Sequence, residues 1–274
     1  MSFEFMLDPE TQRLYLNGFL LTIKLLLGSI FLSFVLAIPM AVARNSRIKA
    51  IKNVVWSFTY VLRGTPLLLQ LYLIYYGLAQ FQFIRESAAW CALSSPLFCA
   101  FLAFTMNELA YTTEIFAGAI RGLPYGEIEA AYAYGMGPFT ILRRIILPLA
   151  LRRSLPAYSN EVVILLHSTS LVTTITLLDL TGAANEIYAR YYLPFEAFMV
   201  AAVVYMTLTY CIVRMFRAAE IHFLAYQRPQ QSNTPLTTLQ SVLHKRWCMG
   251  KSAARILRPR SSLMAEKQKC SSMK

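Results

Sequence analysis

The chain has 274 residues, of which 57% are hydrophobic and only 15% are charged, and its mean hydropathy is +0.47. This composition excludes an ordinary soluble domain and favours a polytopic membrane protein. The formal net charge of +12 could indicate nucleic-acid binding, but Lys and Arg are concentrated between apolar runs and in the C-terminal region. They are interpreted as a topology signal, and no nucleic-acid partner is expected. The Cys residues lack the spacing of a disulfide framework or a zinc site, so no metal is expected.

Five apolar stretches are long enough to be membrane-spanning helices, which need about 20 residues each. In chain order they run from about Phe19 to Ala43, Thr65 to Phe83, Pro96 to Ile120, Tyr158 to Leu178 and Ala197 to Phe216. A segment before the second stretch, Ile51 to Leu62, is interpreted as an interfacial helix flanked by basic residues. The predicted fold is therefore all-α, with five transmembrane helices.

Basic residues distinguish the two sides of the membrane. The loop after the first span carries Arg44, Arg47, Lys49 and Lys52, and the loop after the third carries Arg121, Arg143, Arg144, Arg152 and Arg153, whereas the other two loops carry one Arg each. The positive-inside rule places the basic loops in the cytoplasm, the N-terminus in the periplasm and the C-terminus in the cytoplasm. The chain is thus divided into a periplasmic segment (1–18), a transmembrane domain (19–226) with a cytoplasmic loop (121–156), and a basic, disordered cytoplasmic tail (227–274).

The loop after the third span contains a run of small and polar residues, GEIEAAYAYGMGPFTILRRIILP, from Gly126 to Pro148. Glu129 suits the positive end of a helix, and Ala130 and Ala131 keep one surface small enough for another protein to approach closely. Gly135 is expected to end this helix at a sharp turn. The sequence predicts a short helix, a turn and a second helix on the water side of the membrane.

The same loop resembles a known family. Its residues match every defining position of the Glu-Ala-Ala signature of the membrane subunits of ATP-binding cassette importers, at Glu129, Ala130, Ala131, Gly135, Ile145, Leu147 and Pro148. The segments RGTP at 63–66 and AYTTEI at 110–115 resemble landmarks of polar amino acid permeases, above all those for histidine, lysine, arginine and ornithine, with opine permeases nearby. The resemblance covers roughly residues 15–225. It implies that the loop couples the spans to a cytoplasmic ATPase subunit.

The resemblance also implies partners and a cargo. The partners would be a dimer of ATP-binding subunits, a second homologous permease subunit and a periplasmic substrate-binding protein, all at the lipid bilayer of a bacterial inner membrane. ATP and Mg would bind to the ATPase, so this chain would hold no cofactor and no catalytic site. Related permeases commonly have Lys where this chain has His167. A neutral imidazole repels a cationic substrate less, which favours a basic amino acid or a related opine as cargo.

Polar residues inside the third and fourth spans are candidates for the substrate pathway, because such groups are costly in lipid and face a bundle interior or water. The candidates are Glu108, Tyr111, Glu114, Asn160, Glu161, His167 and Ser170. A structural role remains an alternative for Glu114 and Glu161, which could pair with Arg121 or Arg63 near the cytoplasmic ends. Glu108 lies deeper and would need a buried partner.

Two other functional classes remain open. One is a proton-coupled secondary amino acid transporter, in which the intramembrane Glu residues form a proton relay. Such a protein should show paired inverted repeats, and none stands out among the spans. The other is a membrane-anchored scaffold whose basic tail binds anionic lipid or nucleic acid.

Overall fold

The computed structural model describes residues 8–224 of the chain, so the predictions for residues 1–7 and for the tail at 227–274 lie outside the described part. The chain divides into two units, residues 1–225 and 226–274, and the description concerns the first. Its described residues form helices and no strands, which confirms the all-α class. The α-helices are α1 (Pro9–Arg44), α2 (Lys49–Gly64), α3 (Leu67–Tyr72), α4 (Gln82–Arg85), α5 (Trp90–Leu93), α6 (Pro96–Arg121), α7 (Tyr125–Ala133), α8 (Pro138–Ile141), α9 (Leu147–Ser168), α10 (Leu180–Tyr191) and α11 (Pro194–Leu224).

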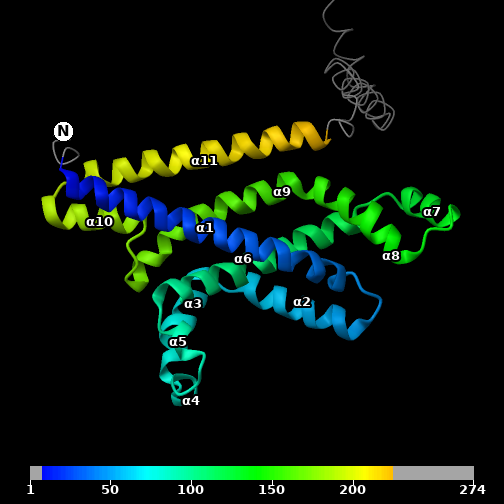
Figure 1. Cartoon of the computed structure of the whole chain (residues 1–274), viewed down its shortest axis with the longest axis horizontal. Coiled ribbons are helices and arrows are strands. Elements are labelled where there is room, and N and C mark those ends of the chain that lie inside the picture. Colours follow the sequence, from blue (N-terminus) through cyan, green and yellow to red (C-terminus); the bar gives the residue numbers. More distant parts are fainter. Residues whose placement is uncertain (1–7, 225–274) are drawn as a thin grey trace, which may run out of the picture. The chain divides into compact units, whose positions relative to one another are not determined.

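The helices α1 and α6 lie side by side and run in the same direction (Figure 1). The buried face of α1 is lined by small residues at helical spacing, among them Ser29, Ser33, Ala37 and Ala41. Small side chains let two helix backbones approach closely, which is the usual basis of helix packing where lipid removes the hydrophobic driving force. The long α1–α6 contact therefore follows from the sequence of α1.

An aromatic cluster joins four of the long helices. The rings of Phe34 on α1, Phe116 on α6 and Tyr158 on α9 lie 5.4 to 5.7 Å apart, and Phe216 on α11 lies 6.0 Å from Tyr158. These separations are typical of favourable edge and tilted ring contacts. The cluster fixes the ends of α1, α6, α9 and α11 that lie toward α7 and α8.

A break in the helix lies at the start of the predicted second span, and the apolar helix that follows it, Leu67–Gln80, is shorter than the predicted span. The chain turns sharply between α2 and α3 (Figure 1). Helix α3 continues through a π-helical segment, Leu73–Gly77, and a 3₁₀ turn, Leu78–Gln80. Helix α2 contains the segment predicted to lie at the membrane interface, and it packs along α6 and α1; its interfacial position stays a prediction. Its Thr59 is buried and donates a hydrogen bond to Glu114 at 2.9 Å.

By length and composition, two of the described helices could each cross a membrane, Pro9–Arg44 and Pro194–Phe223, and the bent pair Pro138–Ile175 and Leu180–Tyr191 could form a third span. The third predicted span coincides with α6, but Asn107, Glu108 and Glu114 lower the hydropathy of that helix. Helix α1 begins at Pro9, before the start of the predicted first span at Phe19, and Asp8 caps it by accepting a hydrogen bond from the backbone N–H of Glu10 at 3.2 Å. The five-span count and the orientation stay predictions.

A buried carboxylate holds the connection between α9 and α10. Asp179 is fully buried and caps α10 by accepting from the backbone N–H of Gly182 at 2.9 Å. It also accepts from the hydroxyls of Thr173 at 2.5 Å and Tyr205 at 3.0 Å. The backbone of Asp179 rests on α1 at Gly18, where a Cβ would lie 2.6 Å from the Asp179 carbonyl oxygen. Asp179 therefore ties α10 to both α11 and α1.

Replacing Asp179 with Ala is expected to destabilise the protein by about 2–4 kcal/mol, because a helix cap and bonds to a charged acceptor are lost together and their donors stay buried. The thermal midpoint of the purified protein in detergent should fall by about 5–15 °C. Asp179→Asn retains one acceptor oxygen and should lie between the two. A midpoint for Asp179→Ala equal to that of the wild type would show that Asp179 does not hold this region.

Candidate functional site

The first part of the site is the break between α2 and α3. Thr65 has extended backbone angles (φ −114°, ψ 140°), and so has Pro66 (φ −60°, ψ 136°). A residue before proline is disfavoured in the helical region, and proline has no N–H to continue the helix. The sequence Arg63-Gly64-Thr65-Pro66 thus ends α2 and leaves its last carbonyl groups without helical partners.

Side-chain amides replace the missing helical hydrogen bonds. The Gln70 amide nitrogen donates to the Leu62 carbonyl at 2.7 Å and to the Thr65 carbonyl at 3.1 Å. Asn107 on α6 in turn donates to the Gln70 side-chain oxygen at 3.2 Å. Since Gln70 is buried, these bonds hold the broken segment at a defined distance from α6.

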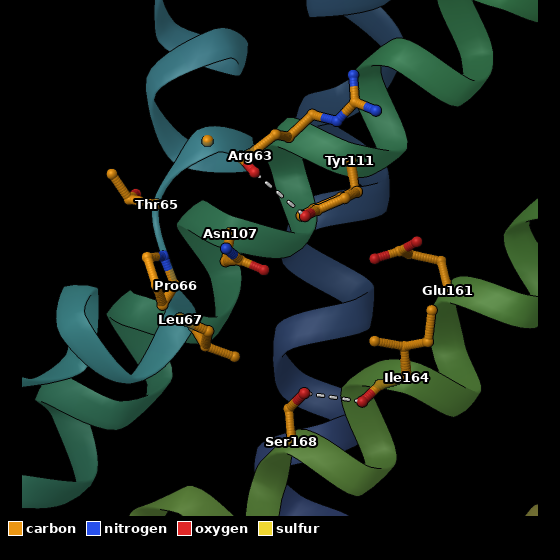
Figure 2. A pocket seen from close by; sticks show the side chains of 10 residues that line it. Arg63, Thr65, Pro66, Leu67, Asn107, Tyr111, Glu161, Ile164 and Ser168 are labelled. Carbon is orange, nitrogen blue, oxygen red and sulfur yellow. Dashed lines mark hydrogen bonds between the residues drawn. The ribbon is translucent and has the colours of Figure 1, made fainter.

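The break forms one wall of a cavity of about 420 Å³. Residues Arg63–Leu67 line it from the break, Asn107 and Tyr111 from α6, and Glu161, Ile164 and Ser168 from α9. In Figure 2 the Glu161 carboxylate points from α9 toward the side of the cavity that bears Asn107 and Tyr111. Three separate parts of the chain therefore meet around one cavity, whose size suits a small molecule and whose largely apolar wall carries a few polar and charged groups.

The cavity carries charges of both signs. The Arg63 guanidinium lies 5.1 Å from the centre of the Tyr111 ring, which is a cation–π contact, and the Tyr111 hydroxyl faces the Arg63 carbonyl at 3.5 Å. Arg63 also attracts Glu161 electrostatically. Glu161 is buried, and no ion pair within 4.0 Å is recorded for it among the described residues. The site thus offers a cation and a carboxylate to a ligand that carries both charges.

Two of the predicted pathway residues, Tyr111 and Glu161, line this cavity. Glu114 does not: it forms an ion pair with Arg44 at 2.5 Å and a longer one with Arg121 at 3.7 Å. The pair with Arg121 agrees with a pairing that the sequence predicts for Glu114, whereas the sequence does not indicate the pair with Arg44. The pairing favours the structural alternative for Glu114, because its carboxylate is engaged in holding α1, α2 and α6 together.

The remaining predicted residues also lie off the cavity. Glu108 is fully buried and accepts from Thr112 at 3.0 Å. The His167 ring contacts Thr209 on α11 at 3.1 Å, and Ser170 donates to the His167 carbonyl at 2.8 Å. Asn160 is exposed and does not line the cavity. Side chains of one helix point in different directions, so residues of the same predicted span do not all face the cavity.

Sequence reasoning missed part of the cavity wall. Thr65, Pro66 and Leu67 line the cavity. From the sequence, the RGTP segment is only a point of similarity to polar amino acid permeases and is not predicted to line a site. The signal available in the sequence was Pro66 itself, since a proline directly after glycine and threonine at the start of an apolar run favours an extended break.

The second part of the site is the loop between α6 and α9. Helix α7 ends in a Schellman motif, in which the N–H of Met136 bonds to the Ala131 carbonyl at 3.2 Å and that of Gly135 to the Tyr132 carbonyl at 2.9 Å. Gly135 has φ +73°, in the left-handed region. The predicted helix, turn and second helix are confirmed, with Pro138 at the start of α8.

The loop projects beyond the ends of the long helices (Figure 1). Ala131 is buried, while Glu129 and Ala130 are exposed. The exposed aromatic side chains of the loop are Tyr125, Tyr132, Tyr134 and Phe139. Ile145 lies in a π-helical segment, Leu142–Ile146, and Leu147 and Pro148 begin α9. Large exposed aromatics beside small residues are typical of a surface that another protein covers.

The loop is anchored at its base. The Arg153 guanidinium on α9 donates to the Gly122 carbonyl at 2.8 Å, and Arg121 donates to the Asn45 side-chain oxygen at 3.2 Å. Asn45 also donates to the Ala117 carbonyl at 3.2 Å. The base of the loop is therefore joined to α1, α6 and α9 by hydrogen bonds.

Comparison with known proteins places the chain among transport proteins. Residues 25–220 match the family described as binding-protein-dependent transport system inner membrane component. The chain is 46% identical over 218 residues to the histidine/lysine/arginine/ornithine transport system permease protein HisM of Escherichia coli (strain K12), with 79% of this chain and 92% of that protein covered. It is 40% identical over 214 residues to the nopaline transport system permease protein NocM of Agrobacterium fabrum, with 78% and 89% covered.

Solved structures agree. A chain of an amino acid ABC transporter crystallised with histidines matches with a TM-score of 0.71 and 30% identity, covering 81% of this chain and 99% of that one. A chain of the inward-facing MetNI methionine transporter matches with a TM-score of 0.67 at 20% identity, covering 79% and 99%, and this supports the fold alone. The resemblance found from the loop motif is confirmed. The chain belongs to the family of binding-protein-dependent transport system inner membrane components and is a permease subunit of an ATP-binding cassette importer.

Proposed function

We propose that this subunit imports basic amino acids or related opines across a bacterial inner membrane, together with a second homologous permease subunit, two ATP-binding subunits and a periplasmic substrate-binding protein. The relatives described above are permeases for histidine, lysine, arginine and ornithine and for nopaline, which supports this cargo class. ATP and Mg would bind to the ATP-binding subunits.

The cavity beside the α2–α3 break is the proposed cargo site. Glu161 would bind the cationic side chain of the cargo, and Arg63 would attract its carboxylate. Asn107 and the Tyr111 hydroxyl would provide hydrogen bonds at the cavity wall. The buried Glu161 carboxylate is the single observation that carries the choice of a cationic cargo, because a buried charge gains most from an opposite charge.

The loop at 121–156 is the proposed coupling contact with the ATPase. Glu129 is exposed and has no partner among the described residues, so it is available to a basic group on another subunit. ATP binding would close the ATPase dimer and move α7, and the base of the loop would carry the movement to α1, α6 and α9. Alternating access of the cargo cavity would follow.

The proposed topology has five spans, with the N-terminus in the periplasm and the C-terminus in the cytoplasm. The distribution of Lys and Arg among the loops supports it. It is consistent with the common direction of α1, α6 and α11, each of which runs toward the end that bears the loop (Figure 1).

Uptake by proteoliposomes tests this function. The complex assembled with the subunits encoded by neighbouring genes should accumulate labelled arginine only when ATP is inside and the binding protein is outside. Unlabelled lysine, ornithine and histidine should compete, whereas glutamate and leucine should not. Preferential uptake of an anionic or neutral amino acid would refute the cargo class, and uptake driven by a proton gradient without ATP would refute the coupling.

A further inference from the structure

One face of α1 carries exposed apolar side chains at helical spacing. Leu16, Leu20, Leu27 and Phe31 are each at least 60% exposed. Their spacing of four, seven and four residues keeps them on one side of the helix. Lys24 lies four residues after Leu20 and three before Leu27, so it belongs to the same face, and it is exposed as well. An otherwise apolar helix face thus contains one cationic side chain.

Lys24 has no hydrogen-bond or ion-pair partner within residues 8–223, the range over which side chains are described. An ammonium group in apolar surroundings requires an anion or water, because the loss of its hydration is otherwise uncompensated. The partner of Lys24 must therefore come from outside these residues.

A cavity of about 300 Å³ opens beside Lys24, between α1 and the N-terminal end of α6. Phe98 and Phe101 form its apolar wall, and Ser95, which precedes α6, adds a hydroxyl. Gly28 brings the wall close to α1, since a Cβ at this position would lie 2.9 Å from the Phe101 ring. The cavity thus combines a cationic group, a hydroxyl and an aromatic surface.

The depth of Lys24 suits the headgroup region. Lys24 lies five residues after Phe19, where the apolar run begins, and this corresponds to about 8 Å along the helix. Side chains on a helix tilt toward its N-terminus, which is the periplasmic end in the orientation proposed above. The flexible stem of a lysine can extend in this direction and bring the ammonium group to the level of lipid phosphates.

We propose that this cavity binds one anionic phospholipid of the periplasmic leaflet. The lipid phosphate would contact Lys24 and Ser95, and part of an acyl chain would pack against Phe98 and Phe101. Charge complementarity selects the occupant: the cavity offers a positive charge and no negative one, so an anionic headgroup is favoured over a zwitterionic one, whose own ammonium gains no partner. The inference uses the proposed orientation but is independent of the cargo.

Native mass spectrometry of the assembled complex tests the site. The complex would be released from nanodiscs of dioleoylphosphatidylcholine containing a minor fraction of dioleoylphosphatidylglycerol, and the phosphatidylglycerol retained per complex would be counted. Lys24→Ala is expected to lower this retention about fivefold, the effect of losing one lysine contact with an anionic lipid. Lys24→Arg should retain the lipid.

Arg13→Ala is the matched control, because it removes one positive charge from an exposed position on the same helix, away from the cavity. It should leave the retention unchanged, and all variants should keep the same subunit stoichiometry. Equal retention by Lys24→Ala and the wild type would overturn the proposal. So would efficient cross-linking of Lys24→Cys to the second permease subunit, which would show that a protein covers the cavity.

Discussion

Replacing Glu161 with Gln should weaken the apparent affinity for arginine about ten- to hundredfold, since a charge-assisted hydrogen bond contributes about 1.5–3 kcal/mol and each 1.4 kcal/mol is a factor of ten. The loss should be specific for charge. Citrulline has the shape of arginine but a neutral side chain, so the ability of citrulline to compete should fall much less. The measurement is competition for ATP-driven uptake of labelled arginine by proteoliposomes.

Glu186→Gln is the control for this substitution. Glu186 is an exposed carboxylate on α10 and does not line the cavity. Its loss should leave both affinities unchanged, while Glu161→Asp should recover part of the preference for arginine. If Glu161→Gln weakened arginine and citrulline equally, Glu161 would not bind the cationic group, although the importer assignment would stand.

Replacing Gly135 with Val should uncouple the transporter. Gly135 has φ +73°, in the left-handed region of the backbone. A residue with a Cβ in this region costs about 1–2 kcal/mol of conformational free energy, and a β-branched side chain such as that of Val costs more. The loop would then adopt its native turn about 5- to 30-fold less often, because such energies correspond to population changes of that size. ATP-driven uptake and co-purification of the ATP-binding subunit should fall together.

The chain provides a matched control two residues away. A Cβ at Gly135 or at Gly137 meets no atom within 4 Å, but Gly137 has an ordinary φ of −68°. Gly137→Val should therefore retain the coupling, and Gly135→Asn should retain most of it because asparagine tolerates the left-handed conformation. Loss of uptake in both Val variants alike would instead show that side-chain bulk, and not backbone conformation, matters in this loop.

The coupling loop could be predicted in detail because its structure is local. Gly135 permits one particular helix end, Pro138 begins the next helix, and both effects depend on neighbours within a few residues. The long apolar helices α1 and α11 were predictable for a similar reason, since the hydrophobic length of a segment decides whether it can span a membrane.

The cargo cavity could be predicted only in part, because it depends on contacts between segments far apart in the chain. Nothing near Gln70 in the sequence indicates that its amide will replace the backbone bonds lost at Pro66. Glu114 and Tyr111 are predicted together as pathway residues, but the partner of Glu114 in its ion pair, Arg44, lies 70 residues away in the sequence, and no local pattern indicates that contact.

Family membership decides between the functional classes left open by the sequence. Residues 25–220 match the inner membrane components of binding-protein-dependent transport systems. This match favours an importer subunit over a proton-coupled secondary transporter. The intramembrane carboxylates then do not need to act as a proton relay. Glu114 has a partner, and Glu161 faces a cavity that could hold a cationic cargo.

The ion pair between Arg44 and Glu114 has a consequence for the biogenesis of the protein. In the proposed topology Glu114 enters the membrane within α6, and a carboxylate in a membrane helix is costly until it is neutralised. Its partner stands at the end of α1, which is synthesised and inserted earlier. If α6 spans the membrane as proposed, its stable integration should therefore depend on α1 already being in place, and the first helix would assist the assembly of the third predicted span.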